Sequence, residues 1–78
     1  MAELIEFRSV NADGTPGDVV ASATLAVGVV SYVGATAEQT VQMLARRFRR
    51  TEAEMFALVR EQGWSNGWLM AVNRGASI

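Results

Sequence analysis

The sequence contains no cysteine, no histidine and no lysine, and it has a single proline. Without cysteine no disulfide can form, and without cysteine or histidine the usual thiolate and imidazole zinc sites are excluded. The same absences remove the Ser–His pair, the cysteine nucleophile and the imidazole proton shuttle. Carboxylate chemistry is left, but the eight acidic residues show no close pair in an apolar setting. We therefore expect no enzyme activity, no metal, no cofactor and no small-molecule substrate.

A strong charge imbalance and a long unbroken apolar run are also absent. The net charge is −1, which gives no general attraction to nucleic acid or anionic lipid. The longest apolar stretch, residues 19–35, is interrupted by polar side chains and falls short of a membrane span. Glu3 and Glu6 stand near the N-terminus, where a secretory signal would carry a basic leader. We expect a soluble protein without a membrane partner, located in the cytoplasm or incorporated into a phage particle assembled there.

The length of the chain predicts one domain, residues 1–78. In a domain of this size the free energy of apolar burial barely exceeds the lost chain entropy, so such domains often depend on a staple or a partner. A covalent staple is excluded here because there is no cysteine. We therefore expect the protein to associate with itself or with a larger protein.

Period-two patterns predict strands in the N-terminal half. Residues 3–10 alternate apolar and charged side chains and predict a first strand, and turn-forming residues at 11–18 predict a loop. Residues 19–33 are rich in β-forming residues but too long for one ordinary strand. We expect a break near 26–28, with strands at about 18–25 and 28–33. A single long bent strand is the alternative.

The two faces of this long β segment differ in character. One face is predicted to carry Val19, Ala21, Ala23, Leu25, Val27 and Val29. The other is predicted to carry Val20, Ser22, Thr24, Ala26 and Gly28, which are mostly small. No charged residue occurs between 19 and 33, although charges normally guard an exposed sheet edge. This segment is therefore predicted to pair or stack with another subunit; coverage by the helices is the alternative.

Helical spacing follows from residue 37. An apolar stripe recurs at Ala37, Val41, Leu44, Ala45 and Phe48. Thr36 and Gln39 fit a capping box at the start of this helix.

A second capping box marks another helix. Thr51 and Glu54 have the required spacing, and the helix is predicted over about 52–62 with Gly63 as its C-cap. Its buried positions are predicted to be Met55, Phe56, Leu58 and Val59. One helix over 37–62, kinked at Thr51, is the alternative to two.

The C-terminal segment predicts a last strand and completes the fold. The Asn66-Gly67 step indicates a tight turn, and alternation over 67–73 indicates a strand. Residues 74–78 are expected to fray. The order β-β-β-α-α-β predicts an α+β domain in which a helical hairpin packs on one face of an antiparallel sheet.

Four arginines form the first candidate binding surface. Helical geometry spreads Arg46, Arg47, Arg49 and Arg50 over an exposed arc of roughly 160° and directs Phe48 into the core. Guanidinium forks bind oxyanions, so the arc could hold nucleic-acid phosphates or an acidic protein. The alternative is a solvated helix end whose charges match the helix dipole and pair with nearby glutamates.

Two tryptophans around the predicted turn form another candidate surface. Indole rings offer a large apolar area and are common at interaction hot spots. We expect Trp64 to lie in the core and Trp68 to be more exposed. The alternative is that the pair serves to lock the last strand onto the helices.

One part of the sequence is similar to known proteins. It runs from Gly28 through the two predicted helices to the motif Gly63-Trp64-Ser65-Asn66-Gly67-Trp68. It resembles small uncharacterised proteins of actinobacteria and their phages that end in a Gly-Trp-Ser-Asn-Gly-aromatic strand. The resemblance covers about residues 28–72 and rests mainly on this motif, in which Trp68 stands where tyrosine is more usual. It implies a structural head or tail component, or an accessory protein, of a phage or mobile element.

Two hypotheses of function follow from these features. In the first, the chain is a non-catalytic interaction or assembly module that binds copies of itself or a larger protein through the sheet edge, the tryptophans and the arginines. In the second, it is an accessory protein that binds nucleic acid through the Arg46–Arg50 cluster.

Overall fold

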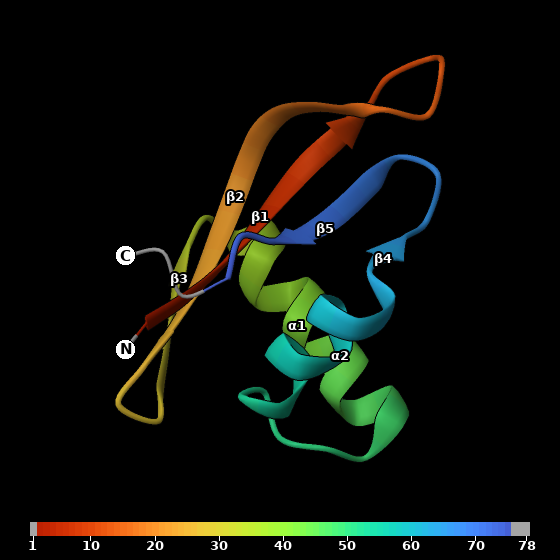
Figure 1. Cartoon of the computed structure of the whole chain (residues 1–78). Coiled ribbons are helices and arrows are strands. Elements are labelled where there is room, and N and C mark those ends of the chain that lie inside the picture. The colour runs from red at the N-terminus through yellow and green to blue at the C-terminus, as the bar shows by residue number, and fades with distance from the viewer. Residues whose placement is uncertain (1, 76–78) are drawn as a thin grey trace.

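The structure, a computed structural model, describes residues 2–75. Its elements are β1 (Ala2–Val10), β2 (Pro16–Ala26), β3 (Val29–Val33), α1 (Ala35–Phe48), α2 (Glu54–Gln62), β4 (Trp64–Ser65) and β5 (Leu69–Asn73). The strands form one antiparallel sheet in the order β3-β2-β1-β5-β4. Both helices pack on the same face of this sheet (Figure 1). The predicted α+β class, with a helical pair on one face, is confirmed.

The break near 26–28 is a two-residue hairpin turn. Val27 and Gly28 both have positive φ angles, 51° and 74°, as a type I′ turn requires. Ala26 and Val29 on either side of the turn are directly paired. The chain therefore forms two strands here, and the single long bent strand is excluded. The turn is strained at Val27, because a positive φ is unfavourable for a β-branched residue.

The predicted apolar face over residues 19–29 is wrong at both ends. A register shift leaves Val20 as a bulge, and Val19 beside it is 46% exposed instead of buried. At the other end the hairpin reversal leaves Val27 94% exposed. The same reversal places Val29 on the sheet face that the helices do not cover. A period-two pattern cannot predict the bulge or the hairpin reversal, because each of them interrupts the regular alternation of side chains between the two faces.

The core lies between the helices and the covered face of the sheet. It consists of Ile5, Phe7, Ala21, Ala23, Ala37, Val41, Leu44, Ala45, Met55, Phe56, Val59 and Ala71. Small residues let α1 begin close to β2: a Cβ atom added to Gly34 would lie 3.1 Å from the Cβ of Ala21. Gly34 also has φ 92°, which L side chains rarely adopt. The junction between β3 and α1 therefore requires glycine.

The two predicted capping boxes have different outcomes. The box at Thr36 and Gln39 is wrong, because α1 begins earlier with Gly34 as its N-cap and without a side-chain cap. The box at Thr51 is confirmed: its N–H donates to Glu54 Oε1 at 2.8 Å, and the N–H of Glu54 donates to Thr51 Oγ1 at 3.2 Å. The bond from the Thr51 N–H to the carboxylate, then the hydrogen bond from the Thr51 side chain and the charge of Arg50, hold the pKa of Glu54 below its ordinary value.

The C-terminal strand is shorter than predicted and has a partner that was not predicted. It begins at Leu69, and β4 pairs with it at Trp64 and Ser65. A two-residue strand is too short to show alternation.

The predicted fraying of residues 74–78 is wrong for the first two of them. The N–H of Arg74 donates to the carbonyl of Leu4 at 2.8 Å, and the N–H of Leu4 donates to the carbonyl of Gly75 at 3.3 Å. These bonds continue the contact of the chain with β1. Residues 76–78 lie outside the described residues.

Candidate interaction surfaces

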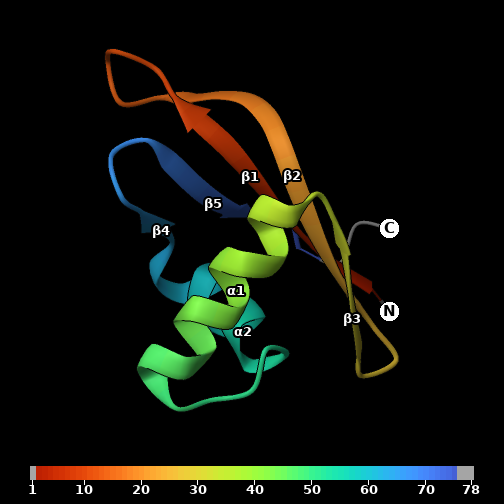
Figure 2. The same ribbon diagram turned by 180° about the vertical axis from the view of Figure 1, so that it is seen from behind.

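Strand β3 forms one edge of the sheet, and among residues 2–75 no strand lies beside its outer side (Figure 2). No charged residue occurs in the sequence between Asp18 and Glu38, so β3 itself is uncharged. Val29 and Val33 are 63% and 69% exposed. Edge strands are normally guarded by charges, proline, a bulge or a covering segment. Along its described length, β3 has none of these protections.

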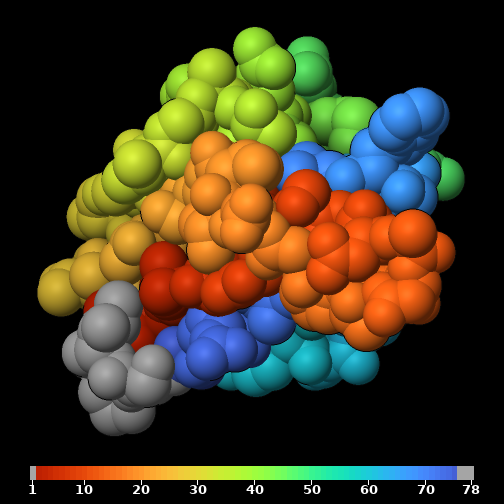
Figure 3. Space-filling view, turned by 90° about the horizontal axis from the view of Figure 1, so that it is seen from above, coloured from red at the N-terminus to blue at the C-terminus, as the bar shows by residue number. Residues whose placement is uncertain are grey.

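The uncharged surface continues from β3 onto β2. On the face away from the helices, Val33 lies opposite Ser22, Ser31 lies opposite Thr24, and Val29 lies opposite Ala26. The helices pack on the other face, so the alternative that they cover this small-residue face is wrong. From above, the orange atoms of β2 lie between the olive hairpin segment and the red atoms of β1 (Figure 3). The side chains along this margin of the sheet are therefore small and uncharged.

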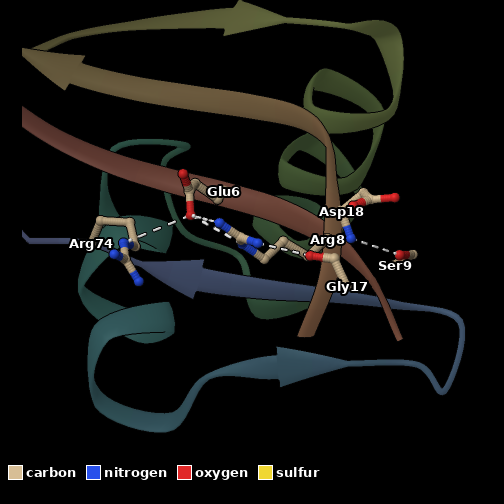
Figure 4. A network of polar contacts seen from close by, with 6 residues as sticks. All are labelled: Glu6, Arg8, Ser9, Gly17, Asp18 and Arg74. Carbon is tan, nitrogen blue, oxygen red and sulfur yellow. Dashed lines mark hydrogen bonds and ion pairs between the residues drawn. The ribbon is translucent and has the colours of Figure 1, made fainter. Parts of the chain in front are cut away.

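Three charged side chains on the same face, Glu6, Arg8 and Arg74, pair with one another (Figure 4). Arg8 on β1 donates to Glu6 Oε1 from Nε at 3.1 Å and from Nη2 at 2.9 Å. Its Nη1 donates to the carbonyl of Gly17 at 2.7 Å, and Arg74 Nε lies 3.7 Å from Glu6 Oε1. These charges are satisfied within the subunit. The uncharged margin at β3 is thus separate from these paired charges.

Tyr32 fixes the edge strand to the helical layer. Its hydroxyl donates a hydrogen bond to the carboxylate of Glu52, in the connection between α1 and α2. Burial of the phenol, and next the bond to Glu52, raises the pKa of Tyr32 above its ordinary value. The bond and the packing of Tyr32 against the core hold β3 in place. The outer side of β3 is therefore a pre-organised edge.

The arginine cluster does not form the predicted helical arc. Helix α1 ends at Phe48, and Arg49 adopts the left-handed conformation with φ 55° and ψ 47°. The N–H groups of Arg49 and Arg50 donate to the carbonyls of Arg46 at 3.3 Å and Ala45 at 2.9 Å, as in a Schellman motif. Residues 37–62 are therefore two helices, not one kinked helix. The four exposed arginines extend from the last turn of α1 into the connection.

Phe48 is 44% exposed, so its predicted place in the core is wrong. The helical spacing continues through it, but the C-terminal end of α1 extends beyond the sheet, where nothing in the sheet can cover it (Figure 2). The guanidinium carbon of Arg47 lies 6.0 Å from the centre of the Phe48 ring. Arg50 pairs with Glu54 at 3.6 Å, both side chains being about half exposed. Arg46 and Arg50 also line an open depression of about 630 Å³.

The tryptophans lie at the edge of the sheet opposite β3. Trp64 in β4 is half-buried against the core, and Trp68 is 84% exposed. Asn66 Oδ1 accepts hydrogen bonds from the N–H groups of Trp68 and Leu69, both at 2.9 Å. These bonds fix the turn, so the indole of Trp68 stands on a rigid support. Its exposed position is as predicted.

The fold keeps the predicted site residues in three separate places. The tryptophans lie at the β4 edge, the arginines at the outer end of α1, and the uncharged surface at the β3 edge. The sequence predicted that the uncharged segment 19–33 pairs with another subunit, but the small-residue face named for it did not include Val29, Ser31 and Val33, which form its outermost part. The absence of charge up to Glu38 was the available signal.

Among the described residues, no cluster of three or more acidic, cysteine or histidine side chains is arranged to hold a metal ion. In the same part of the chain, no helix combines the length and the apolar character that a membrane crossing requires. Comparison of the chain with protein-family models, with curated proteins and with solved structures finds no match.

Proposed function

We propose that this domain is a non-catalytic assembly module that pairs with a second copy of itself through the outer edge of β3. The observation that carries the proposal is the exposed, uncharged edge strand of Val29–Val33. Its outer main-chain N–H and C=O groups offer a row of hydrogen-bonding partners. Proteins that must stay monomeric normally guard such a row, and the sequence of this strand does not.

A second copy is the partner that the chemistry of this edge favours. An antiparallel strand pair is self-complementary, so the same strand can serve both sides of a two-fold interface. The edge carries no charge, and two copies therefore bring no like charges together. Pairing also adds buried area to a domain of 78 residues, whose own core is small.

Trp68 supports a second contact with a larger protein. It lies in the turn between β4 and β5, the strand pair on the side of the sheet opposite β3, so a dimer formed through β3 carries one exposed indole in the outer part of each subunit. A rigid, exposed tryptophan is typical of interaction hot spots. The resemblance of residues 28–72 to proteins of actinobacteria and their phages supports a structural or accessory role in a phage or mobile element.

The proposal predicts that the molecular mass rises with protein concentration. One five-residue strand pair forms a small interface, so the dimer belongs to the weak class that buries less than about 1,200 Å². Sedimentation equilibrium from about 1 µM to about 1 mM covers the corresponding range of dissociation constants. A mass that moves from one subunit to two supports the proposal. A single-subunit mass at every concentration contradicts it.

A nucleic-acid partner is the second candidate function, and the exposed ring of Phe48 favours it. Single-strand binding combines arginines with an aromatic platform on which bases stack. Phe48 provides that platform beside Arg46, Arg47 and Arg49, although the net charge of −1 gives no general attraction.

This second candidate predicts salt-dependent binding of a fluorescent single-stranded oligonucleotide, measured by anisotropy. Replacing Arg46 and Arg49 by glutamine should flatten the slope of log affinity against log salt by about 1.4, since each single-strand phosphate contact contributes about 0.7. Arg60→Gln, on α2, is the matched control. Absence of binding at low salt would rule the candidate out.

A further inference from the structure

We infer that two copies pair in one register, antiparallel, with the two-fold axis at Ser31 of β3. The inference rests on the proposed function and adds its geometry. It begins with the hairpin that joins β2 and β3, because that hairpin determines which main-chain groups of β3 remain available.

The type I′ turn sets the hydrogen-bonding pattern of β3. In a two-residue hairpin, the residues on either side of the turn exchange both main-chain hydrogen bonds. Ala26 and Val29 are that pair, and hydrogen-bonded pairs then recur at every second residue. Val29, Ser31 and Val33 thus direct their N–H and C=O groups toward β2. Val30 and Tyr32 direct theirs outward, to the free edge.

A symmetric antiparallel pair must use these two outward residues. When the axis lies at Ser31, Val30 of each copy exchanges both hydrogen bonds with Tyr32 of the other, giving four bonds within the strand. An axis at Val30 would pair Tyr32 with Gly28, which belongs to the turn and has φ 74°. An axis at Tyr32 would pair Val30 with Gly34, which has φ 92° and already belongs to the start of α1. The axis at Ser31 is the register that pairs all five residues of β3.

The side chains of β3 fit this register. On the face away from the helices, Ser31 meets Ser31 of the second copy, and Val29 meets Val33 at both ends. Valine pairs across strands are favourable, and the serine pair can form a hydrogen bond. Val30 and Tyr32 meet on the helical face, where both already pack against the core of their own subunit. The exposed valines at the two ends of β3 thus become covered by each other.

Single cysteines test the register directly, because the natural chain has none. In Ser31→Cys the two thiols lie across a non-hydrogen-bonded pair with Cα atoms about 4.5 Å apart, within reach of a disulfide. In Val29→Cys the equivalent Cα atoms are separated by four residues along the strand, about 14 Å, and cannot be bridged. Both positions are exposed, so both thiols are open to a mild oxidant. Dimer formation is followed on a non-reducing gel.

We expect Ser31→Cys to cross-link at least about tenfold faster than Val29→Cys at the same concentration, a ratio that the geometry demands. A mixture of Val29→Cys and Val33→Cys proteins should cross-link between unlike chains, because the register places these residues opposite each other. Equal rates for the two single variants, or no hetero-disulfide in the mixture, would overturn the register. If sedimentation still showed a dimer, the proposed function would survive that result. A protein that stays monomeric at all concentrations would contradict both the proposed self-association and the register.

Discussion

Replacing Val33 by lysine is expected to weaken self-association by about 100-fold. Val33 is 69% exposed in the subunit and is covered by Val29 of the second copy in the proposed pair. Lysine would place an ammonium group against this apolar partner, and lysine is a residue with which proteins guard sheet edges. The change occurs twice in a symmetric dimer, and a loss of about 1.4 kcal/mol at each site gives the expected factor. Sedimentation equilibrium measures it.

Matched substitutions separate the β3 edge from a general effect of charge. Val20→Lys adds the same charge at a 53% exposed valine of β2 that lies outside the proposed strand pair. Trp68→Ala removes the exposed indole at the opposite edge of the sheet. Both should leave the dimer intact. Adding Val29→Glu to Val33→Lys should restore association, because it places opposite charges across the interface at both ends. Equal weakening by Val20→Lys would contradict pairing through β3.

Replacing Phe7 by alanine is expected to lower the free energy of unfolding by about 3–5 kcal/mol, the usual cost of removing a buried phenylalanine ring. Phe7 lies on the central strand β1 and is fully buried. A chain of this length has a total stability of about 4–12 kcal/mol, so the variant should lose a large part of its stability and unfold at a much lower urea concentration. Urea denaturation followed by circular dichroism gives the difference.

Phe48→Ala is the matched control, because it removes the same ring from a site that is 44% exposed. It should cost less than about 1 kcal/mol, since the ring is only partly removed from water. If Phe48→Ala lowered the free energy of unfolding as much as Phe7→Ala, the Phe48 ring would have to be buried, which would contradict its exposed position at the end of α1.

Local sequence patterns predicted most of the fold. The alternation in residues 3–10 corresponds to β1, and the Thr51–Glu54 spacing forms the expected capping box. Both depend on residues close together in the chain, so the sequence displays them directly. The Thr36–Gln39 spacing shows the limit of such patterns. There the close approach of Gly34 to Ala21, a contact between distant residues, decides where α1 begins.

The candidate site was less predictable, because its features depend on which strands become neighbours. The sequence shows that residues 19–33 lack charge, but not that β3 is the edge of the sheet. Phe48 has the spacing of a buried residue, and its exposure follows from how far α1 extends past the sheet. Val29 changes face because the chain reverses at Val27 and Gly28. Each outcome is set by the arrangement of the elements and not by the pattern within one element.

Hydrogen exchange of the main-chain amides of Val30 and Tyr32, compared at low and high protein concentration, tests pairing through β3 most directly. These N–H groups point away from β2, so water reaches them in one subunit, and the strand pair covers them. Pairing predicts that their exchange slows as concentration rises, while amides of the Val27–Gly28 turn keep their rates. Exchange of Val30 and Tyr32 that is independent of concentration would contradict it.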